Sequence, residues 1–110
     1  MKAELTSKHC TACEKGADRL NGEAIQRLRQ ELGEGWHVVD EHHLQKAFEF
    51  KNFKEALAFT NRVGEVAEQE GHHPDIFLTW GKVQLSLHTH SIDGLSENDF
   101  ILAAKADQVR

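Results

Sequence analysis

The sequence predicts an α+β fold in two layers, a four-stranded antiparallel sheet with its helices on one face. Four short segments alternate apolar and polar residues, and they fall into two pairs that are each joined by a short connection. Apolar residues at helical spacing lie before, between and after these pairs. Because each pair can close as a hairpin, the order α-β-β-α-β-β-α places the helices together over one sheet.

The first helix and hairpin are expected between residues 21 and 50. Residues 21–32 carry apolar side chains at i, i+3 and i+7, and two glycines follow them. Residues 36–40 (WHVVD) and 44–50 (LQKAFEF) then alternate as strands do, and the connection between them is short enough for a hairpin.

The second helix is expected from Asn52 to about Glu70. Asn52 can cap its first turn, and Glu55 is placed to reach back to it in a capping box. Gly71 follows the last turn and fits the left-handed conformation in which many helices end, because glycine adopts it without strain.

A second hairpin and a last helix complete the order. Residues 75–81 (DIFLTWG) and 82–90 (KVQLSLHTH) are expected as strands with a turn near Gly81. Residues 91–95 are expected as a loop. Ser96-Glu97-Asn98-Asp99 is a second capping-box pattern, and the helix that it opens is expected to run to about residue 108.

The length and charge of the chain restrict its class. One hundred and ten residues suit one small domain, which we assign to residues 21–110, with residues 1–20 as an N-terminal extension. No apolar run approaches the ~20 residues that span a bilayer, and the first residues lack the apolar core of a secretory signal. We therefore expect a cytoplasmic protein. The net charge is −5 without a Lys/Arg cluster, so direct nucleic-acid binding is not expected.

Two cysteines, Cys10 and Cys13, form a single C-x-x-C in the extension. Such a pair is typical of half a zinc site or of a redox centre. A second C-x-x-C is absent from the sequence, and no strand-helix pattern surrounds this one. We interpret the pair as two thiols in the extension, and the sequence does not assign them a role.

Eight histidines are the anomaly of the composition, and two of them, His72 and His73, are adjacent. They lie between Gly71 and Pro74, where the helix has stopped and proline holds its predecessor in extended geometry. A break of this kind can direct two neighbouring side chains into one cleft. Histidine also titrates near neutral pH, which suits acid-base chemistry.

Further candidate residues lie on either side of this pair. Glu68 lies in the last turn of the helix, where the helix dipole already disfavours an anion, so a nearby imidazolium would be stabilised and Glu68 could orient it. His88 and His90 share the polar face of the last strand. We expect these two rings to line one pocket with the adjacent pair.

A metal centre and a triad hydrolase are the competing interpretations. Four imidazoles suit the tetrahedral nitrogen shell of zinc, but the H-E-x-x-H spacing is absent and neighbouring rings rarely reach one ion. A G-x-S-x-G nucleophile motif is also absent from the sequence. We therefore expect neither a metal nor another cofactor.

One spaced pattern resembles a known family, the pterin-4a-carbinolamine dehydratases. Glu68 is followed after three residues by His-His-Pro, then after five residues by Trp80, after nine by His90 and after eight by Asp99. The resemblance covers about residues 20–108. The runs KNFKEALAFTNRVGEVAEQEGHHP and GLSENDF are similar to bacterial members associated with phenylalanine hydroxylase.

The resemblance implies a hydro-lyase that dehydrates 4a-hydroxytetrahydropterin, the 4a-carbinolamine, to quinonoid dihydropterin and water. This reaction belongs to the recycling of tetrahydrobiopterin during aromatic amino acid hydroxylation, and it uses histidine acid-base catalysis with no metal or redox cofactor. The resemblance also implies a homodimer or homotetramer and a functional link to phenylalanine hydroxylase. A regulatory or scaffold protein for the hydroxylase system, or a role in molybdopterin metabolism, remains the alternative.

The resemblance also implies residue roles. His72 and His90 would be the acid-base pair, His73 would bind the pterin and stabilise charge, and Glu68 would couple to His72. The residues expected to border the pterin are Gly71, His72, His73, His88, Thr89, His90 and Ser91. Asp99, Trp80 and Pro74 are expected to act structurally or indirectly, Asp99 because it also closes a capping box and Trp80 as a packing residue at the edge of the pocket.

Overall fold

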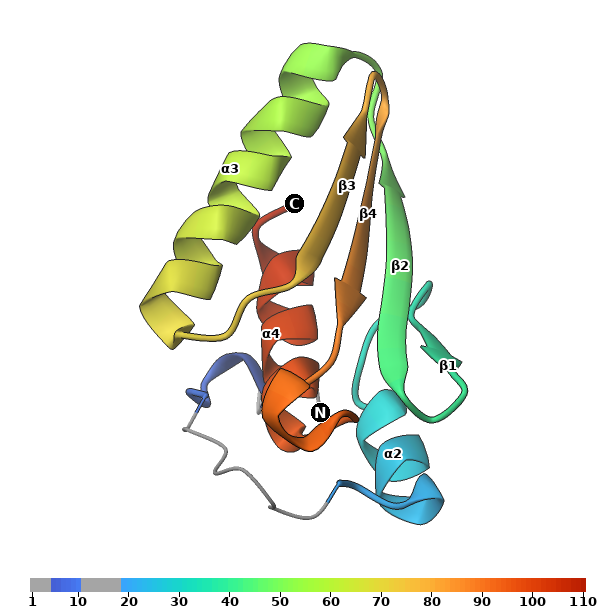
Figure 1. Cartoon of the computed structure of the whole chain (residues 1–110). Helices are drawn as coiled ribbons and strands as arrows, with labels where there is room; N and C mark the ends of the chain where they lie inside the picture. The colour runs from blue at the N-terminus through green and yellow to red at the C-terminus, as the bar shows by residue number, and fades with distance from the viewer. Residues whose placement is uncertain (1–4, 11–18) are drawn as a thin grey trace.

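A computed structural model describes residues 5–10 and 19–110 of the chain. It confirms the α+β fold and the order α-β-β-α-β-β-α (Figure 1). The elements of this part of the chain are α2 (Gly22–Arg29), β1 (His37–Val39), β2 (His43–Glu49), α3 (Phe53–Glu70), β3 (Asp75–Thr79), β4 (Lys82–Leu87), the short 3-10 helix η1 (His90–Ile92) and α4 (Glu97–Gln108).

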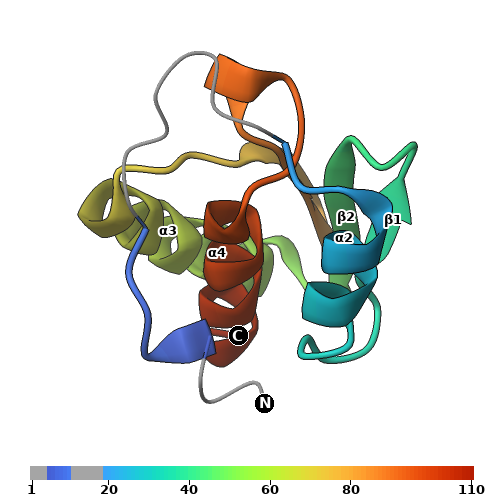
Figure 2. The same cartoon turned by 90° about the horizontal axis from the view of Figure 1, so that it is seen from below.

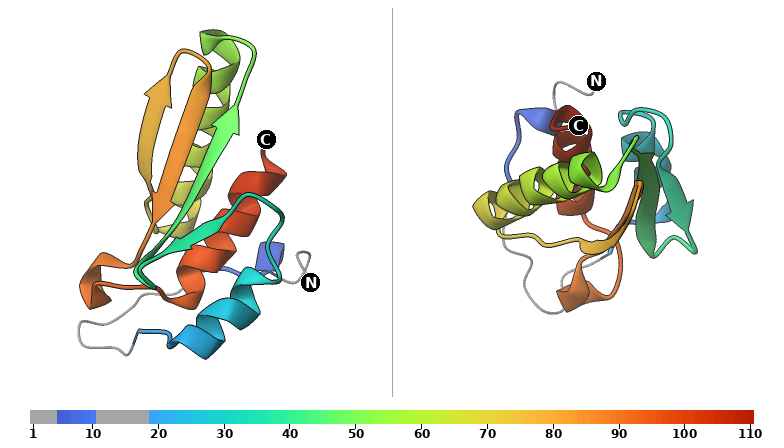
Figure 3. Two further views of the ribbon diagram at one scale, coloured as in Figure 1. Left: turned by 90° about the vertical axis from the view of Figure 1, so that its right-hand side faces the viewer. Right: turned by 90° about the horizontal axis from the view of Figure 1, so that it is seen from above.

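The four strands form one antiparallel sheet in the order β1-β2-β4-β3. Val83 of the central strand β4 pairs with Phe48 of β2 on one side and with Leu78 of β3 on the other. The helices α3 and α4 lie side by side along one face of this sheet (Figure 3). α4 is the middle helix, between α3 and α2 (Figure 2). The first strand of the order, β1, and the last, β3, therefore form the edges.

The core lies between the sheet and α4. Alternate residues of the two central strands face the helices and are buried, whereas their neighbours face away, which is the pattern of a sheet covered on one side. α4 is buried almost all round because it packs against both α3 and the sheet. The fully buried large side chains of the described residues are Trp36, Phe48, Phe59, Phe100, Leu5, Ile25, Leu44, Leu85, Leu87, Leu95, Ile101 and Leu102.

The predicted helix ends are confirmed in their main features. The side-chain oxygen of Asn52 accepts the backbone N–H of Glu55 at 2.9 Å. Gly71 ends α3 with φ 66° in the left-handed region. Ser96 and Asp99 form the reciprocal capping box of α4. These ends depend on neighbours in the sequence, which is why local patterns predict them.

The predicted strand 82–90 is too long. β4 ends at Leu87, and beyond it Thr89 pairs with Gly94 only as an isolated bridge. The chain then turns into η1 instead of the predicted loop, and Asp93 ends η1 with a left-handed backbone. The strand stops here because β2 and β3 offer no further partner: their last pairs with β4 join Leu44 to Leu87 and Asp75 to Ser86.

The described part of the extension, residues 5–10, packs on the domain. Leu5 has no exposed surface and belongs to the core cluster. Lys8 bonds Glu97 of α4 at 2.9 Å, and the backbone N–H of Cys10 donates to Glu70 of α3 at 2.7 Å. The predicted boundary between residues 20 and 21 stays a prediction, and Cys13 lies outside the described residues.

Candidate functional site

The adjacent histidines lie where the chain leaves α3 and crosses to β3, a connection at the lower end of α3 in Figure 1. The backbone N–H of His72 still donates to Ala67 at 3.2 Å, one of the last hydrogen bonds of the helix end. Gly71 then reverses the chain, so the side chains of His72 and His73 take different directions. Each of the two rings contacts a different carboxylate.

His72 points inward to α4. Its Nε2 atom lies 2.6 Å from Oδ1 of Asp99, and the two side chains are 12% and 0% exposed. The other oxygen, Oδ2, accepts the hydroxyl of Thr89 at 2.8 Å and the backbone N–H of Ser96 at 3.0 Å. Asp99 is therefore both the cap of α4, as the sequence predicts, and the carboxylate that holds His72.

His73 points outward to α3. Its Nε2 atom lies 2.5 Å from Oε2 of Glu68, and both side chains are mostly exposed. The expectation that Glu68 couples to His72 is therefore wrong. The ring of His72 instead contacts the buried Asp99, whereas the ring of His73 contacts the exposed Glu68.

The rings of His88 and His90 lie together beyond the end of β4, with ring centroids 4.0 Å apart. That these two rings line one pocket with His72 and His73 stays a prediction. A third ring, which no sequence pattern indicates, belongs to the same stack. The ring centroid of His42 lies 4.8 Å from that of His88, and Nε2 of His42 lies 2.8 Å from Oδ1 of Asp93. Only the β2-β4 register brings the β1-β2 turn to this place, so no local pattern indicates it.

The electrostatics of this stack act most strongly on its middle ring. Burial lowers the pKa of His88 because it disfavours the charged form, and repulsion from His90 and His42 lowers it further. Asp75 and Asp99 oppose this shift, but they do not outweigh it. The site therefore favours the neutral form of His88.

The other predicted residues fall into two groups. Thr89 is buried against Asp99, Pro74 is half-buried, and Gly71 and Ser91 are exposed beside the histidines. Trp80, in contrast, is 67% exposed in the β3-β4 turn, and it follows the last residue of β3 whereas His73 precedes the first. The expectation that Trp80 packs at the edge of the pocket is wrong for this chain, because the whole length of β3 separates it from the histidines.

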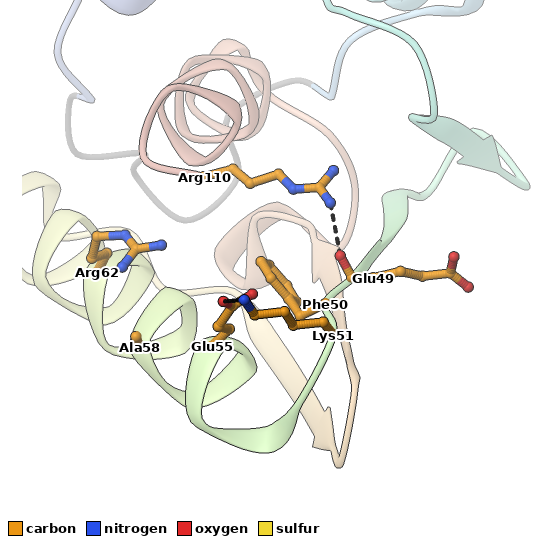
Figure 4. Close-up of a pocket in the computed structure, with 7 residues that line it drawn as sticks. All are labelled: Glu49, Phe50, Lys51, Glu55, Ala58, Arg62 and Arg110. Atoms are coloured by element: carbon orange, nitrogen blue, oxygen red, sulfur yellow. Dashed lines mark hydrogen bonds and ion pairs between the residues drawn. The ribbon is translucent and has the colours of Figure 1, made fainter.

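Two surface pockets are lined by residues other than the histidines. A pocket of about 510 Å³ lies between the end of β2 and the start of α3 (Figure 4). Both of its arginines are already engaged: Arg110 donates to the carbonyl of Glu49 at 2.7 Å and Arg62 to that of Val109 at 2.6 Å. A groove of about 730 Å³ along α3 includes Glu68 alone among the predicted site residues.

Within residues 5–10 and 19–110, no group of three or more His, Cys, Asp or Glu side chains is arranged to hold a metal ion. None of the helices in the same ranges is long and apolar enough to cross a membrane.

Comparison with known proteins gives a consistent family. A model of the pterin 4 alpha carbinolamine dehydratase family matches residues 18–109. A Rubrobacter xylanophilus protein that carries the name pterin-4-alpha-carbinolamine dehydratase is 52% identical over 107 residues, 97% of this chain and 99% of its own length. A protein of the same name from Alkaliphilus metalliredigens is 53% identical over 104 residues, 94% of each chain.

Solved structures agree with the fold. The chain superposes with a TM-score of 0.78 on the transcriptional coactivator/pterin dehydratase from Brucella melitensis, at 31% identity over 84% of this chain and 98% of the other. A pterin dehydratase-like RuBisCO assembly factor of the alpha-carboxysome superposes with a TM-score of 0.59, at 23% identity over 68% and 88% of the two chains, which supports the fold alone. The family match over most of the chain and the relatives above 50% identity establish that this protein belongs to the pterin-4a-carbinolamine dehydratases, which are hydro-lyases.

Proposed function

We propose that the protein dehydrates 4a-hydroxytetrahydropterin to quinonoid dihydropterin and water by histidine acid-base catalysis. The observation that carries this mechanism is the role of Asp99 at the end of the sheet. Its carboxyl group contacts His72 directly and also bonds Thr89, the residue before His90. One buried group therefore fixes the positions of both proposed acid-base residues relative to α4.

The reaction needs two proton transfers and no change of oxidation state in the protein. The C4a–O bond breaks as the hydroxyl takes a proton and leaves as water, and a ring N–H gives up its proton as the C=N bond forms. A general acid and a general base with pKa values near neutrality suit these steps. His72 and His90 supply these two groups, and the pH profiles of their variants assign the two roles.

The remaining predicted residues are proposed to bind the pterin. His73, with Glu68 at its ring nitrogen, is exposed at the same end of the molecule and can receive a polar edge of the ring. The contact with Glu68 fixes the orientation of this ring, and the proposed role of His73 is to bind the pterin and to stabilise charge that develops in it. The proposed border of the ring is completed by Gly71, His88, Thr89 and Ser91.

A coupled turnover assay tests the function. Phenylalanine hydroxylase generates the 4a-carbinolamine in place, and its ultraviolet absorbance is followed with and without this protein. We expect faster decay with the wild type, and loss of that acceleration in His72→Ala and His90→Ala. His37→Ala, the same change at an exposed histidine of β1, is the matched control. A folded wild type that does not accelerate the decay would contradict the proposal and favour a scaffold role.

Partners and assembly are also proposals. We assign the protein to the cytoplasm, as a homodimer or homotetramer with a functional link to phenylalanine hydroxylase. The described edge strand β3 and its turn expose three large apolar side chains, Ile76, Phe77 and Trp80, and exposed apolar patches often mark protein interfaces. Light scattering on the eluting protein measures the mass, and a monomer would exclude both assemblies.

A further inference from the structure

Three imidazole rings form a continuous stack at the end of the sheet, which we call the histidine stack: His42, His88 and His90. Successive ring centroids are 4.8 Å and 4.0 Å apart. The outer ring, His42, is anchored on both nitrogens, by Asp93 at 2.8 Å and by Nδ1 of His43 at 3.2 Å. The stack therefore has one fixed end and one end, His90, at the proposed site.

The backbone around this anchor is strained. Within residues 5–10 and 19–110, the non-glycine residues with positive φ are Asp40 at 54°, Glu41 at 53° and Asp93 at 50°. The first two form the turn that presents His42, and the third carries the carboxylate that His42 contacts. Left-handed geometry is unfavourable for residues that carry a Cβ atom. Strain of this kind gathers where function requires a particular geometry.

The described contacts, taken with the proposed dehydratase function on which this inference rests, lead to a role for the anchor. We propose that His42 is a positioning residue for His90, which it orients through the ring of His88 while Asp93 holds it in place. Neither His42 nor Asp93 belongs to the residues that the family resemblance assigns to the pterin site.

The charges around the middle ring explain how the stack would act. The groups that face His88 are His90 from η1, His42 from the β1-β2 turn, Asp75 from β3 and Asp99 from α4. Burial and repulsion from His90 and His42 outweigh the two carboxylates and lower the pKa of His88, which favours the neutral form of this ring. A neutral His88 does not oppose the gain of a proton by His90, whereas a charged one would.

Asp93 completes the arrangement at the outer end. It is exposed, and its hydrogen bond with His42 is the largest cause that lowers its pKa. Its carboxylate is thus ionised at neutral pH and holds Nε2 of His42 at 2.8 Å. The ring of His88 lies between His42 and His90.

His42→Ala tests the inference, with His37→Ala as the matched control on the same hairpin. The variant loses one cause of the lowered pKa of His88 and exposes that ring, so the titration midpoint of His88 should rise. A proton on His88 would then oppose one on His90, and the pH profile of kcat should move to lower pH. We expect kcat to fall about tenfold, part of the ~10²–10⁴ that a general acid or base supplies, and KM to stay within about twofold.

Two measurements keep the outcomes distinct. Coupled turnover gives kcat, KM and the pH profile, and two-dimensional NMR of the imidazole nitrogens gives the midpoint of His88 without substrate. If His42→Ala matches His37→Ala in both, or if KM rises with kcat unchanged, the inference is overturned. If His42→Ala does not fold by circular dichroism, His42→Phe replaces it, because it keeps the ring and loses the bond to Asp93.

The same pair of measurements separates this inference from the proposed function. A wild type without dehydratase activity would contradict the function, and the His88 midpoint would still report whether His42 acts on the stack. An active wild type with an unmoved midpoint and pH profile in His42→Ala would overturn the inference alone.

Discussion

Nε2 of His72 lies 2.6 Å from Oδ1 of Asp99, a carboxyl group with no exposed surface. The same carboxyl group receives two further donors, from Thr89 and from the backbone of Ser96. A carboxylate inside a protein requires such partners because burial without them would cost several kcal/mol. The cap of α4 and the orientation of His72 therefore cannot be changed independently.

Asp99→Asn should impair both folding and activity. Asp99 now accepts hydrogen bonds from the hydroxyl of Thr89 and the backbone N–H of Ser96, and the amide group of asparagine would point a donor at one of its present partners. One such unmatched buried pair costs about 1–3 kcal/mol of unfolding free energy. The charge behind His72 is also lost, so we expect kcat in the coupled assay to fall by about a hundredfold.

Asp107→Asn is the matched control for this change. Asp107 lies in the same helix and is also hydrogen-bonded, to Trp36 at 2.9 Å and to Lys46 at 2.7 Å. It should lose stability in chemical denaturation and keep its kcat below the unfolding transition. Equal kcat values for the two variants would contradict a specific role of Asp99 at His72.

Glu68→Gln should change activity and leave stability almost unchanged, whereas the control Asp107→Asn should change stability alone. The Glu68–His73 pair is 78% and 60% exposed, and exposed ion pairs contribute about 0.2–1 kcal/mol. We therefore expect little change in unfolding free energy and a rise in KM for the carbinolamine. Glu65→Gln, an exposed residue one turn earlier in α3, should change neither. A KM equal to that of the wild type would exclude Glu68 from pterin binding.

The free energy of unfolding at acidic pH should depend on Glu70. Burial alone would raise the pKa of its carboxyl, but the N–H of Cys10 and the side chains of His9 and Lys105 outweigh it and lower the pKa to about 2. A carboxyl whose folded pKa lies below its unfolded value of 4.5 stabilises the protein above pH 4.5. That stabilisation should be lost as pH falls from about 4.5 to about 2.

Denaturation of wild type and Glu70→Gln across this window checks the sign. The difference in unfolding free energy between the two proteins should be largest above pH 5 and should shrink toward pH 2. A difference independent of pH would mean that the carboxylate is not the group that binds the extension.

Leu5→Ala should destabilise the protein although Leu5 precedes the predicted domain. The side chain has no exposed surface, and truncation of buried leucines costs about 2–5 kcal/mol. Thermal unfolding followed by circular dichroism measures the effect. Ser7→Ala, an exposed residue of the same segment, is the control. A Tm equal to that of the control would show that the extension contributes nothing to the core.

The sequence by itself determined the order of the elements and the ends of the helices. Periodicity and caps involve residues within a few positions of one another, so Asn52, Gly71 and the Ser96–Asp99 pair could be recognised directly. The family pattern likewise located His72, His73 and His90. It could not locate Trp80, because the length of β3 decides how far that side chain lies from the histidines.

Only the tertiary structure decided which side chains meet. Asp99 reaches His72 across 27 positions, Asp93 reaches His42 across 51, and Glu70 reaches Cys10 across 60. Such contacts depend on the sheet register and on the packing of α4, and a shift of register by one residue would turn these side chains to the other face. Hydrogen bonds are directional and short, so spacing along the chain names the candidates and the fold selects the partners.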